Sequence, residues 1–571
     1  MSIRTAFFEL IPGRAGGIDA SIYIVKALVI ACAQITGLGC GNIEGMRGEL
    51  PMIRKWIAPA IAVALMAPAA ASAKWLKAES QHYIVYSEDS EQGIRHQLER
   101  LEKLNLLQHA ITGMVTDKPS IKVKVFVLPS YQEVNATMAR PAGAAGYYDA
   151  NVRGPYAVIS REDDSAHGFS AQLVLFHELT HHFMFQYFNV AYPVWYVEGF
   201  ADFIGASKVD DTNSVIVGQQ SGNRYYTFRF SNWIPVKDIL NAHNYDDMGS
   251  ELINLYAEGW LLTHYLELGG KRDGQLAKYL TEINAGKSYE DAATDAFGDL
   301  NKLNAELRSY SARPTLPATG ITFKPSAIPE VKIEPVPADQ ALMMVDDIKL
   351  FAGTTPGNAK SFAARVRSDA AQAGETPFAL RLRAEADRRA EEHGDYATAV
   401  TAWNAATPDD PEAMTHLALL KMDGLRAAKS TDAAAWTAAR RLIVNASRKA
   451  PNNALILRAY FESFGMQGVA TTADAHNALY KALDLVPADG ELRYQLAADF
   501  EAHGDIDDAI AVIALSAFTE KSVDSEKEKE KLAKDAGRNR IAGVPRHETA
   551  REMLDRLKKK KAESAGTKAA G

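Results

Sequence analysis

Short alternating patterns of apolar and polar residues predict β-strands in the first third of the chain. The segments HYIVYS (82–87) and IKVKVFVLP (121–129) alternate as half-buried strands do, and an amphipathic helix is expected between them at about 91–112. The run AAGYYDANVRGPYAVIS (144–160) is typical of a hairpin. Helices continue from there to about residue 310. A small sheet with helices segregated around it is an α+β domain.

The pattern changes between residues 313 and 337, where six prolines occur. We expect a stiff linker or an irregular bridge at 312–340. Beyond it the chain is rich in alanine and helical in pattern. Small, aromatic and helix-starting residues recur there as they do in tetratricopeptide (TPR) repeats: Gly394, Tyr396, Ala399, Trp403, Pro411, Pro451, Pro487 and Gly504. The three prolines of this set are spaced close to the 34-residue TPR unit, so this part resembles an all-α, TPR-like helical repeat domain.

The candidate chemistry begins in the run LVLFHELTHHFMFQYF (173–188). His177, Glu178 and His181 spell His-Glu-x-x-His inside an apolar stretch that predicts a helix. Residues four apart share one face of a helix, so the two imidazoles can bind one metal ion, with Glu178 beside its water. The alternative is a pair of ordinary, hydrogen-bonded histidines.

The next predicted helix, in AYPVWYVEGFADFIGAS (191–207), supplies a third candidate ligand. Glu198 lies 17 positions after His181, and catalytic zinc sites often use two His and one Glu. Asp202 follows one turn later, where its carboxylate could accept the free N–H of a ligating imidazole. The alternative for each acidic residue is an exposed helix carboxylate.

HELTH followed by PVWYVEGFAD resembles the glutamate-type zincins (gluzincins), and within them the peptidase MA-like group, over roughly residues 75–310. The resemblance implies a zincin-like fold, one Zn²⁺ per chain bound by His177, His181 and Glu198, and Glu178 as general base. The spacing of Glu198 and Asp202 is similar to that of thermolysin-like enzymes, where the Asp braces a zinc-bound histidine.

Three further residues are candidates for roles in peptide hydrolysis. Tyr256, in NLYAEGWLLTHYL (254–266), could stabilise the oxyanion, although a core tyrosine is an equal alternative. His264 is a second candidate for that role, with a structural role as its alternative. The second strand of the hairpin is a candidate substrate-binding edge, with backbone groups near Val158 pairing with extended peptide. That strand could equally be internal.

Residues 52–73 have the pattern of a secretory signal peptide, with a basic start, an apolar stretch and an Ala-Ser-Ala site ending at Ala73. We expect cleavage after Ala73, a periplasmic or secreted protein, and no stable membrane span afterwards. Residues 1–51 would then be upstream sequence from a mis-assigned start. The alternative is a membrane anchor at 21–39, which Lys26 interrupts.

The positions of the cysteines and the distribution of charge limit which kinds of site and partner are possible. Cys32 and Cys40 both precede the predicted cleavage site, so the mature chain would contain no disulfide and no thiol ligand. The net charge is −8, but the tail at 521–571 is basic and is expected to be disordered and solvated. We therefore predict no nucleic-acid partner, although contact of this basic tail with an anionic membrane or with nucleic acid is the alternative.

The sequence thus predicts a metallopeptidase domain at 74–311, a linker at 312–340, TPR-like repeats at 341–520 and a charged tail at 521–571. The predicted function is an exported zinc peptidase whose repeats recruit a peptide or protein substrate or a protein partner. The alternatives are an inactive scaffold protein and a zinc hydrolase that acts on a non-protein substrate of the cell envelope.

Overall fold

The computed structural model describes most of the chain after the predicted cleavage site. The described residues are 75–570, except for 116–120, 140–145, 163–170, 189–191, 210–211, 221–223, 226, 228–231, 243–244, 246–247, 356 and 520–547. The predicted upstream sequence (1–51), the signal peptide (52–73) and both cysteines lie outside this part of the chain.

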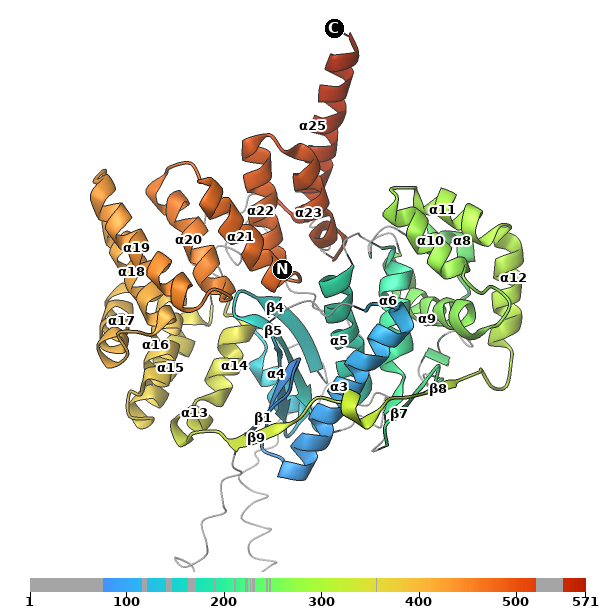
Figure 1. Cartoon of the computed structure of the whole chain (residues 1–571), viewed down its shortest axis with the longest axis horizontal. Coiled ribbons are helices and arrows are strands. Elements are labelled where there is room, and N and C mark those ends of the chain that lie inside the picture. The colour runs from blue at the N-terminus through green and yellow to red at the C-terminus, as the bar shows by residue number, and fades with distance from the viewer. Residues whose placement is uncertain are drawn as a thin grey trace, which may run out of the picture. The chain divides into compact units, whose positions relative to one another are not determined.

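A six-stranded mixed sheet forms the first part of the fold, in the order β4-β5-β3-β2-β1-β9 (Figure 1). The strands β2, β3 and β5 run parallel to one another, while β4, β1 and β9 are antiparallel to their neighbours. The strands are β1 (Leu76–Glu79), β2 (Tyr83–Ser87), β3 (Val123–Leu128), β4 (Gly146–Asn151), β5 (Gly154–Ser160) and β9 (Lys332–Pro335).

The prediction that Val158 lies on a substrate-binding edge strand is wrong, and its strand is internal. β5 pairs with β3 on one side and β4 on the other, and Val158 stands opposite both Phe126 and Tyr147. Its backbone groups therefore serve the sheet, and its side chain is fully buried. Within the described part of the chain, β4 is the outermost strand on this side.

Both faces of the sheet are covered by apolar side chains. On one face, the sheet residues Val125 and Ala157 belong to the same core as Leu98 of α3 (Glu91–Thr112) and Leu175 of α5 (Ala171–Tyr187). On the other face, Tyr156 and Val158 pack with residues from much later in the chain. This burial on both faces accounts for the continuous apolar run in β5.

The helices after the sheet follow the prediction closely. α6 (Val194–Gly205) and α9 (Leu252–Leu268) are buried along most of their length. The other elements here are α4 (Tyr131–Thr137), α8 (Val236–Leu240), η3 (Gly249–Glu251), α10 (Gln275–Asn284), α11 (Tyr289–Phe297), α12 (Leu300–Ser311), β6 (Lys208–Val209) and β7 (Ser214–Val217).

The segment 312–340 is not the linker that its prolines suggested. β8 (Thr319–Thr322) pairs with β7 to complete a small three-stranded sheet, and β9 pairs with β1 at the rim of the large sheet. A proline is tolerated in β9 because an edge strand does not need every N–H. The short helices η4 (Pro325–Ala327) and α13 (Ala338–Leu342) lie in the same segment.

From residue 359 to residue 519, consecutive helices pack against one another, as the repeat pattern predicted (Figure 1). Tyr396, Ala399 and Trp403 are buried between them, and Pro411 begins a helix. The helices are α14 (Met344–Ala352), α15 (Ala359–Gln372), α16 (Pro377–Arg389), α17 (His393–Ala406), α18 (Pro411–Ala427), α19 (Ala433–Lys449), α20 (Ala454–Gln467), α21 (Ala473–Leu485), α22 (Gly490–His503) and α23 (Ile506–Thr519). The chain therefore has an α+β part followed by a helical part.

The described end of the predicted tail is ordered, contrary to expectation. α25 (Ala550–Ala570) packs against α23, with Met553 and Leu557 in their shared apolar cluster. Arg556 also pairs with Glu501, at 2.6 Å between Nη1 and Oε1. In the described part of the chain, no helix has the length and apolar character needed to cross a bilayer.

Candidate metal centre

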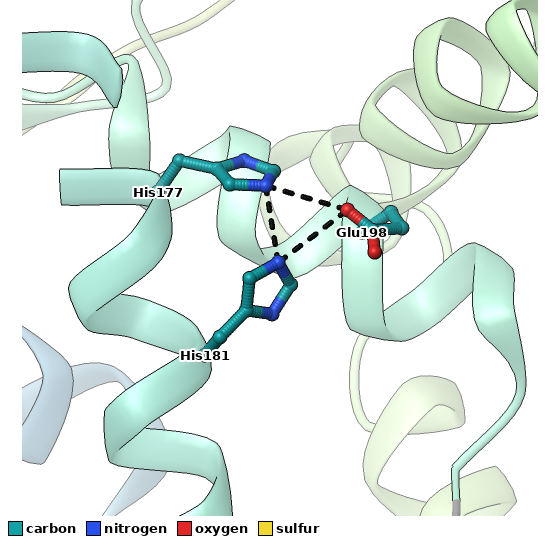
Figure 2. Close-up of side chains that lie close together, drawn as sticks. All are labelled: His177, His181 and Glu198. Atoms are coloured by element: carbon teal, nitrogen blue, oxygen red, sulfur yellow. Dashed lines mark hydrogen bonds and ion pairs between the residues drawn. The ribbon is translucent and has the colours of Figure 1, made fainter. Parts of the chain in front are cut away.

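Two buried helices bring the three predicted ligands together. His177 and His181 lie one turn apart on α5, and Glu198 lies on α6. All three side chains are at least 96% buried. Figure 2 shows the two imidazole rings and the carboxylate pointing toward one another across the space between the helices.

The ligand atoms converge at distances suited to a shared ion. His177 Nε2 lies 3.0 Å from His181 Nε2, and Glu198 Oε2 lies 3.3 and 3.4 Å from those two nitrogens. Among the described residues, these three form the one group of His, Cys, Asp or Glu side chains able to hold a metal ion. The structure therefore brings together the same three residues that the sequence pattern singled out.

The protonation of His177 explains why a cation fits this cluster. Its Nδ1 lies 2.9 Å from Asp202 Oδ1, and since a carboxylate only accepts, Nδ1 carries the proton. In a neutral ring, Nε2 then presents a lone pair toward the other two ligand atoms. A metal ion bound between the two imidazoles and the carboxylate would satisfy all three ligand atoms at once, whereas a proton on His181 Nε2 is the alternative that satisfies them without a metal.

Electrostatics at the centre favour a positive charge as well. Burial lowers the pKa of His177, but the carboxylates of Asp202 and Glu198 outweigh it and raise that pKa to about 10. Burial raises the pKa of Glu198, but the two histidines outweigh it and lower the pKa below the usual range. The carboxylate is therefore ionised and the site is strongly attractive to cations.

Asp202 occupies the bracing position that was predicted for it. It accepts from His177 Nδ1 and is buried on α6 one turn after Glu198. Arg224 completes this arrangement, with its Nε 2.7 Å from Asp202 Oδ2 and its Nη2 3.2 Å from Oδ1. Burial raises the pKa of Asp202, but Arg224 and His177 lower it overall, so Asp202 stays charged.

Two tyrosines lie near the ligands. The Tyr245 hydroxyl donates a hydrogen bond to Glu198 Oε1. Tyr256 is buried on α9, and the guanidinium carbon of Arg224 lies 5.0 Å from the centre of its ring. Burial raises the pKa of both tyrosine hydroxyls well above the usual value, and the negative charge of Glu198 adds to this effect. Both hydroxyls therefore remain protonated and can donate.

Glu178 is buried beside the ligands on α5, with 4% of its surface exposed. Its charge adds to the raised pKa values of Tyr148, Tyr245 and Tyr256, so the carboxyl lies within electrostatic range of these three hydroxyls. Glu178 therefore lies in the same region as the candidate oxyanion donor.

His264 has a structural role instead of the alternative catalytic one. Its Nδ1 lies 3.0 Å from the Tyr310 hydroxyl, and its Nε2 lies 3.0 Å from the Gly218 carbonyl oxygen. Both ring nitrogens thus have protein partners, and the imidazole is fully buried. The ring joins α9 to α12 and to the end of β7.

Arg224 and Tyr245 were not predicted from the sequence. Each comes from a short segment between α6 and α9 that has no regular apolar pattern to fix its position. The available signal was indirect: a buried Asp next to a ligating histidine needs a cationic partner, and several arginines in the chain could have supplied it.

No protein-family model matches this chain, and no curated protein matches it. Among solved structures, a thermophilic TPR protein from Thermus thermophilus is similar to part of it. The two chains are 19% identical with a TM-score of 0.27, over 31% of this chain and 89% of the other. The metal-centre residues are therefore interpreted from their own geometry.

Proposed function

We propose that this protein is a zinc-dependent peptidase. The observation that carries the proposal is the convergence of His177 Nε2, His181 Nε2 and Glu198 Oε2 within 3.0–3.4 Å of one another. Two imidazoles and one carboxylate are a common protein ligand set of catalytic zinc, which keeps a further position open. When bound, zinc supplies a water of pKa about 7 and polarises a carbonyl oxygen.

The protein's own residues supply the proton transfers. Glu178 accepts the proton that the attacking water loses, and it then gives that proton to the leaving amine. Glu178 is buried, and burial shields its carboxyl from bulk solvent, which favours passing the same proton from the water to the amine. Neutral Tyr256 is our candidate for the donor to the oxyanion.

The remaining polar residues hold this arrangement in place. Asp202 fixes the orientation of His177, and Arg224 in turn fixes Asp202. Tyr245 donates to the Oε1 oxygen of Glu198, which leaves Oε2 directed at the two histidines. Such outer contacts typically change metal affinity or activity by 10- to 100-fold when they are removed.

Extended peptide is the substrate class that the sheet suits. β4 is the outermost described strand beside α5, and an extended chain could add to its outer side by backbone hydrogen bonds. This assigns to β4 the role predicted for Val158 of β5. We further propose that the helical repeats recruit the protein substrate or a partner, and that the protein is exported after cleavage at Ala73.

The test combines metal analysis with a matched pair of variants. Purified 74–571 should contain about one zinc per chain, and Glu198→Ala should lose most of it. Glu178→Gln should retain zinc but lose hydrolysis of an unstructured protein substrate, by roughly 10²- to 10⁴-fold. Elemental mass spectrometry and a peptide-release assay provide the two readouts.

Two results would contradict the proposal. Absence of bound metal after zinc is supplied and the excess removed would leave a helical-repeat scaffold as the better interpretation. Full turnover by Glu178→Gln would show that another group is the general base. A circular dichroism spectrum for each variant controls for loss of the fold.

A further inference from the structure

The turn between β4 and β5 is held by helices from the second part of the chain. Arg153, in this turn, donates from Nη2 to Asp347 Oδ1 of α14 at 2.7 Å, and its Nη1 lies 3.4 Å from Glu385 Oε2 of α16. Asn151 Nδ2 donates to the Phe351 carbonyl oxygen of α14 at 3.1 Å. A hairpin turn is usually solvated, but this Arg153 side chain is only 9% exposed.

The charges around the turn are paired. Arg381 joins the same carboxylates, with Nη2 3.0 Å from Asp347 Oδ1 and Nη1 2.8 Å from Glu385 Oε1. Two guanidinium groups thus share two buried carboxylates. Burial raises the pKa of Asp347, but Arg381 and Arg153 outweigh it and keep the carboxyl ionised. Removing one member would leave an uncompensated buried charge, so the cluster acts as a unit.

Aromatic packing strengthens this contact. The guanidinium carbon of Arg153 lies 4.1 Å from the centre of the Phe351 ring, and that ring lies 5.0 Å from Tyr156 of β5. Lys124 Nζ of β3 lies 4.6 Å from the same ring centre. The end of α14 is therefore attached to β3, to β5 and to the β4–β5 turn by apolar, cationic and hydrogen-bonded contacts together.

β4 also contacts the metal-binding helix. The hydroxyl of Tyr148, on β4, lies 2.8 Å from Nδ1 of His182, which directly follows the ligand His181. One side of β4 pairs with β5 along its whole length. β4 is thus attached to α14 and α16 through the β4–β5 turn, and to α5 through Tyr148 near its middle.

We propose that Arg153 is a positioning residue through which α14 and α16 hold β4 in place for substrate. The inference rests on the proposed function, because it assumes that extended peptide adds to the outer side of β4. It assigns to the first helices of the second part a direct role in substrate binding, separate from any recruitment by later repeats. Arg153 itself touches neither the metal ligands nor the peptide.

Asp347→Asn tests this without changing the hairpin. The variant keeps the side-chain shape but removes the charge that pairs with Arg153 and Arg381. We expect the β4 amides that pair with β5 to exchange with deuterium about tenfold faster, with zinc content unchanged. Asp409→Asn is the matched control, because Asp409 is an exposed residue before α18 whose partner is Lys449 and not Arg153 or Arg381.

Kinetics separate positioning from general stability. For a peptide long enough to pair along β4, KM should rise about tenfold in Asp347→Asn with kcat nearly unchanged. For a short peptide that cannot reach the strand, both constants should stay as in the wild type. Arg153→Met should give the same pattern, and the two substitutions combined should add little to either one.

Unchanged β4 exchange in a folded Asp347→Asn protein would overturn the proposal, and so would faster exchange with equal KM values for both peptides. Should Arg153→Met fail to fold, the isosteric Asp347→Asn decides alone. Hydrogen exchange requires neither zinc nor turnover. A protein without zinc or hydrolysis would therefore refute the proposed function, while the exchange data would still report on whether α14 holds β4.

Discussion

Arg224 shows how much of the candidate metal centre depends on a residue outside the three candidate ligands. It is the cationic partner of Asp202, and Asp202 in turn fixes the proton on His177 Nδ1. Its side chain is 95% buried, so it is shielded from the solvent that weakens surface ion pairs. The orientation of the His177 ring thus depends on two residues from other segments, Asp202 and Arg224.

We expect Arg224→Met to lower zinc affinity by roughly 10- to 100-fold, because Asp202 would lose the partner that orients it. Arg224→Lys should recover part of that loss, since one ammonium can pair with the carboxylate but cannot make both contacts. Competition with a zinc chelator measures the affinity. Arg313→Met, at an exposed arginine near Tyr310, is the control; wild-type affinity in Arg224→Met would remove Arg224 from the metal centre.

At the residue scale, the sequence was informative wherever a single helix defines the geometry. His177 and His181 could be predicted because a helix fixes the relation between positions four apart. Glu198 and Asp202 needed the added resemblance to a known motif. Arg224 and Tyr245 could not be predicted, because short irregular segments have no periodic pattern that states where their side chains point.

At the scale of elements, α6 and α9 approach each other through glycine. A Cβ atom on Gly199 would lie 2.3 Å from the Gly259 carbonyl oxygen, and one on Gly259 would lie 2.6 Å from the Trp195 carbonyl oxygen. No side chain fits at either position without moving a backbone. Because Gly199 directly follows Glu198, this close approach also determines where the third candidate ligand lies.

Gly199→Ala should therefore cost about 1–3 kcal/mol of the free energy of unfolding through overpacking, and it should weaken zinc binding by displacing Glu198. Gly424→Ala is the matched control, because Gly424 lies in a helix with open space around it. It should stabilise the protein by about 0.5–1 kcal/mol. Denaturant titrations measure the free energy of unfolding of both variants. Equal values for Gly199→Ala and Gly424→Ala would show that α6 and α9 can move apart at no cost.

Strand pairing was the least predictable feature of the elements. The alternation in 144–160 predicted a hairpin correctly, but local pattern does not state which of its strands has a second neighbour. The prolines at 314–337 suggested a linker, yet two short strands, β8 and β9, lie between them. Both strands pair with partners far away in the sequence, so only tertiary structure reveals them.

For the whole molecule, the boundary between the sheet and the repeats differs from the predicted one. The repeats were predicted to begin at residue 341, but Ile348 and Phe351 of α14 belong to the apolar cluster that covers Tyr156 and Val158 on the sheet. The next cluster is formed by α14, α15 and α16, and α16 also packs against α17 through Leu380 and Ala384. The first structural unit should therefore extend at least to about residue 390.

Two truncations test this boundary. A chain of 74–340 lacks α14 and would expose the face of the sheet that carries Tyr156 and Val158. It should therefore bind a hydrophobic dye and unfold without a cooperative transition. A chain of 74–390 keeps the Arg153 cluster and the two apolar clusters that include α14, so we expect it to unfold cooperatively and retain zinc. Calorimetry and metal analysis of the two proteins give the answer. Cooperative unfolding of 74–340 would show that the helices are an independent attachment, whereas failure of both would mean that the later repeats are also needed to support the sheet.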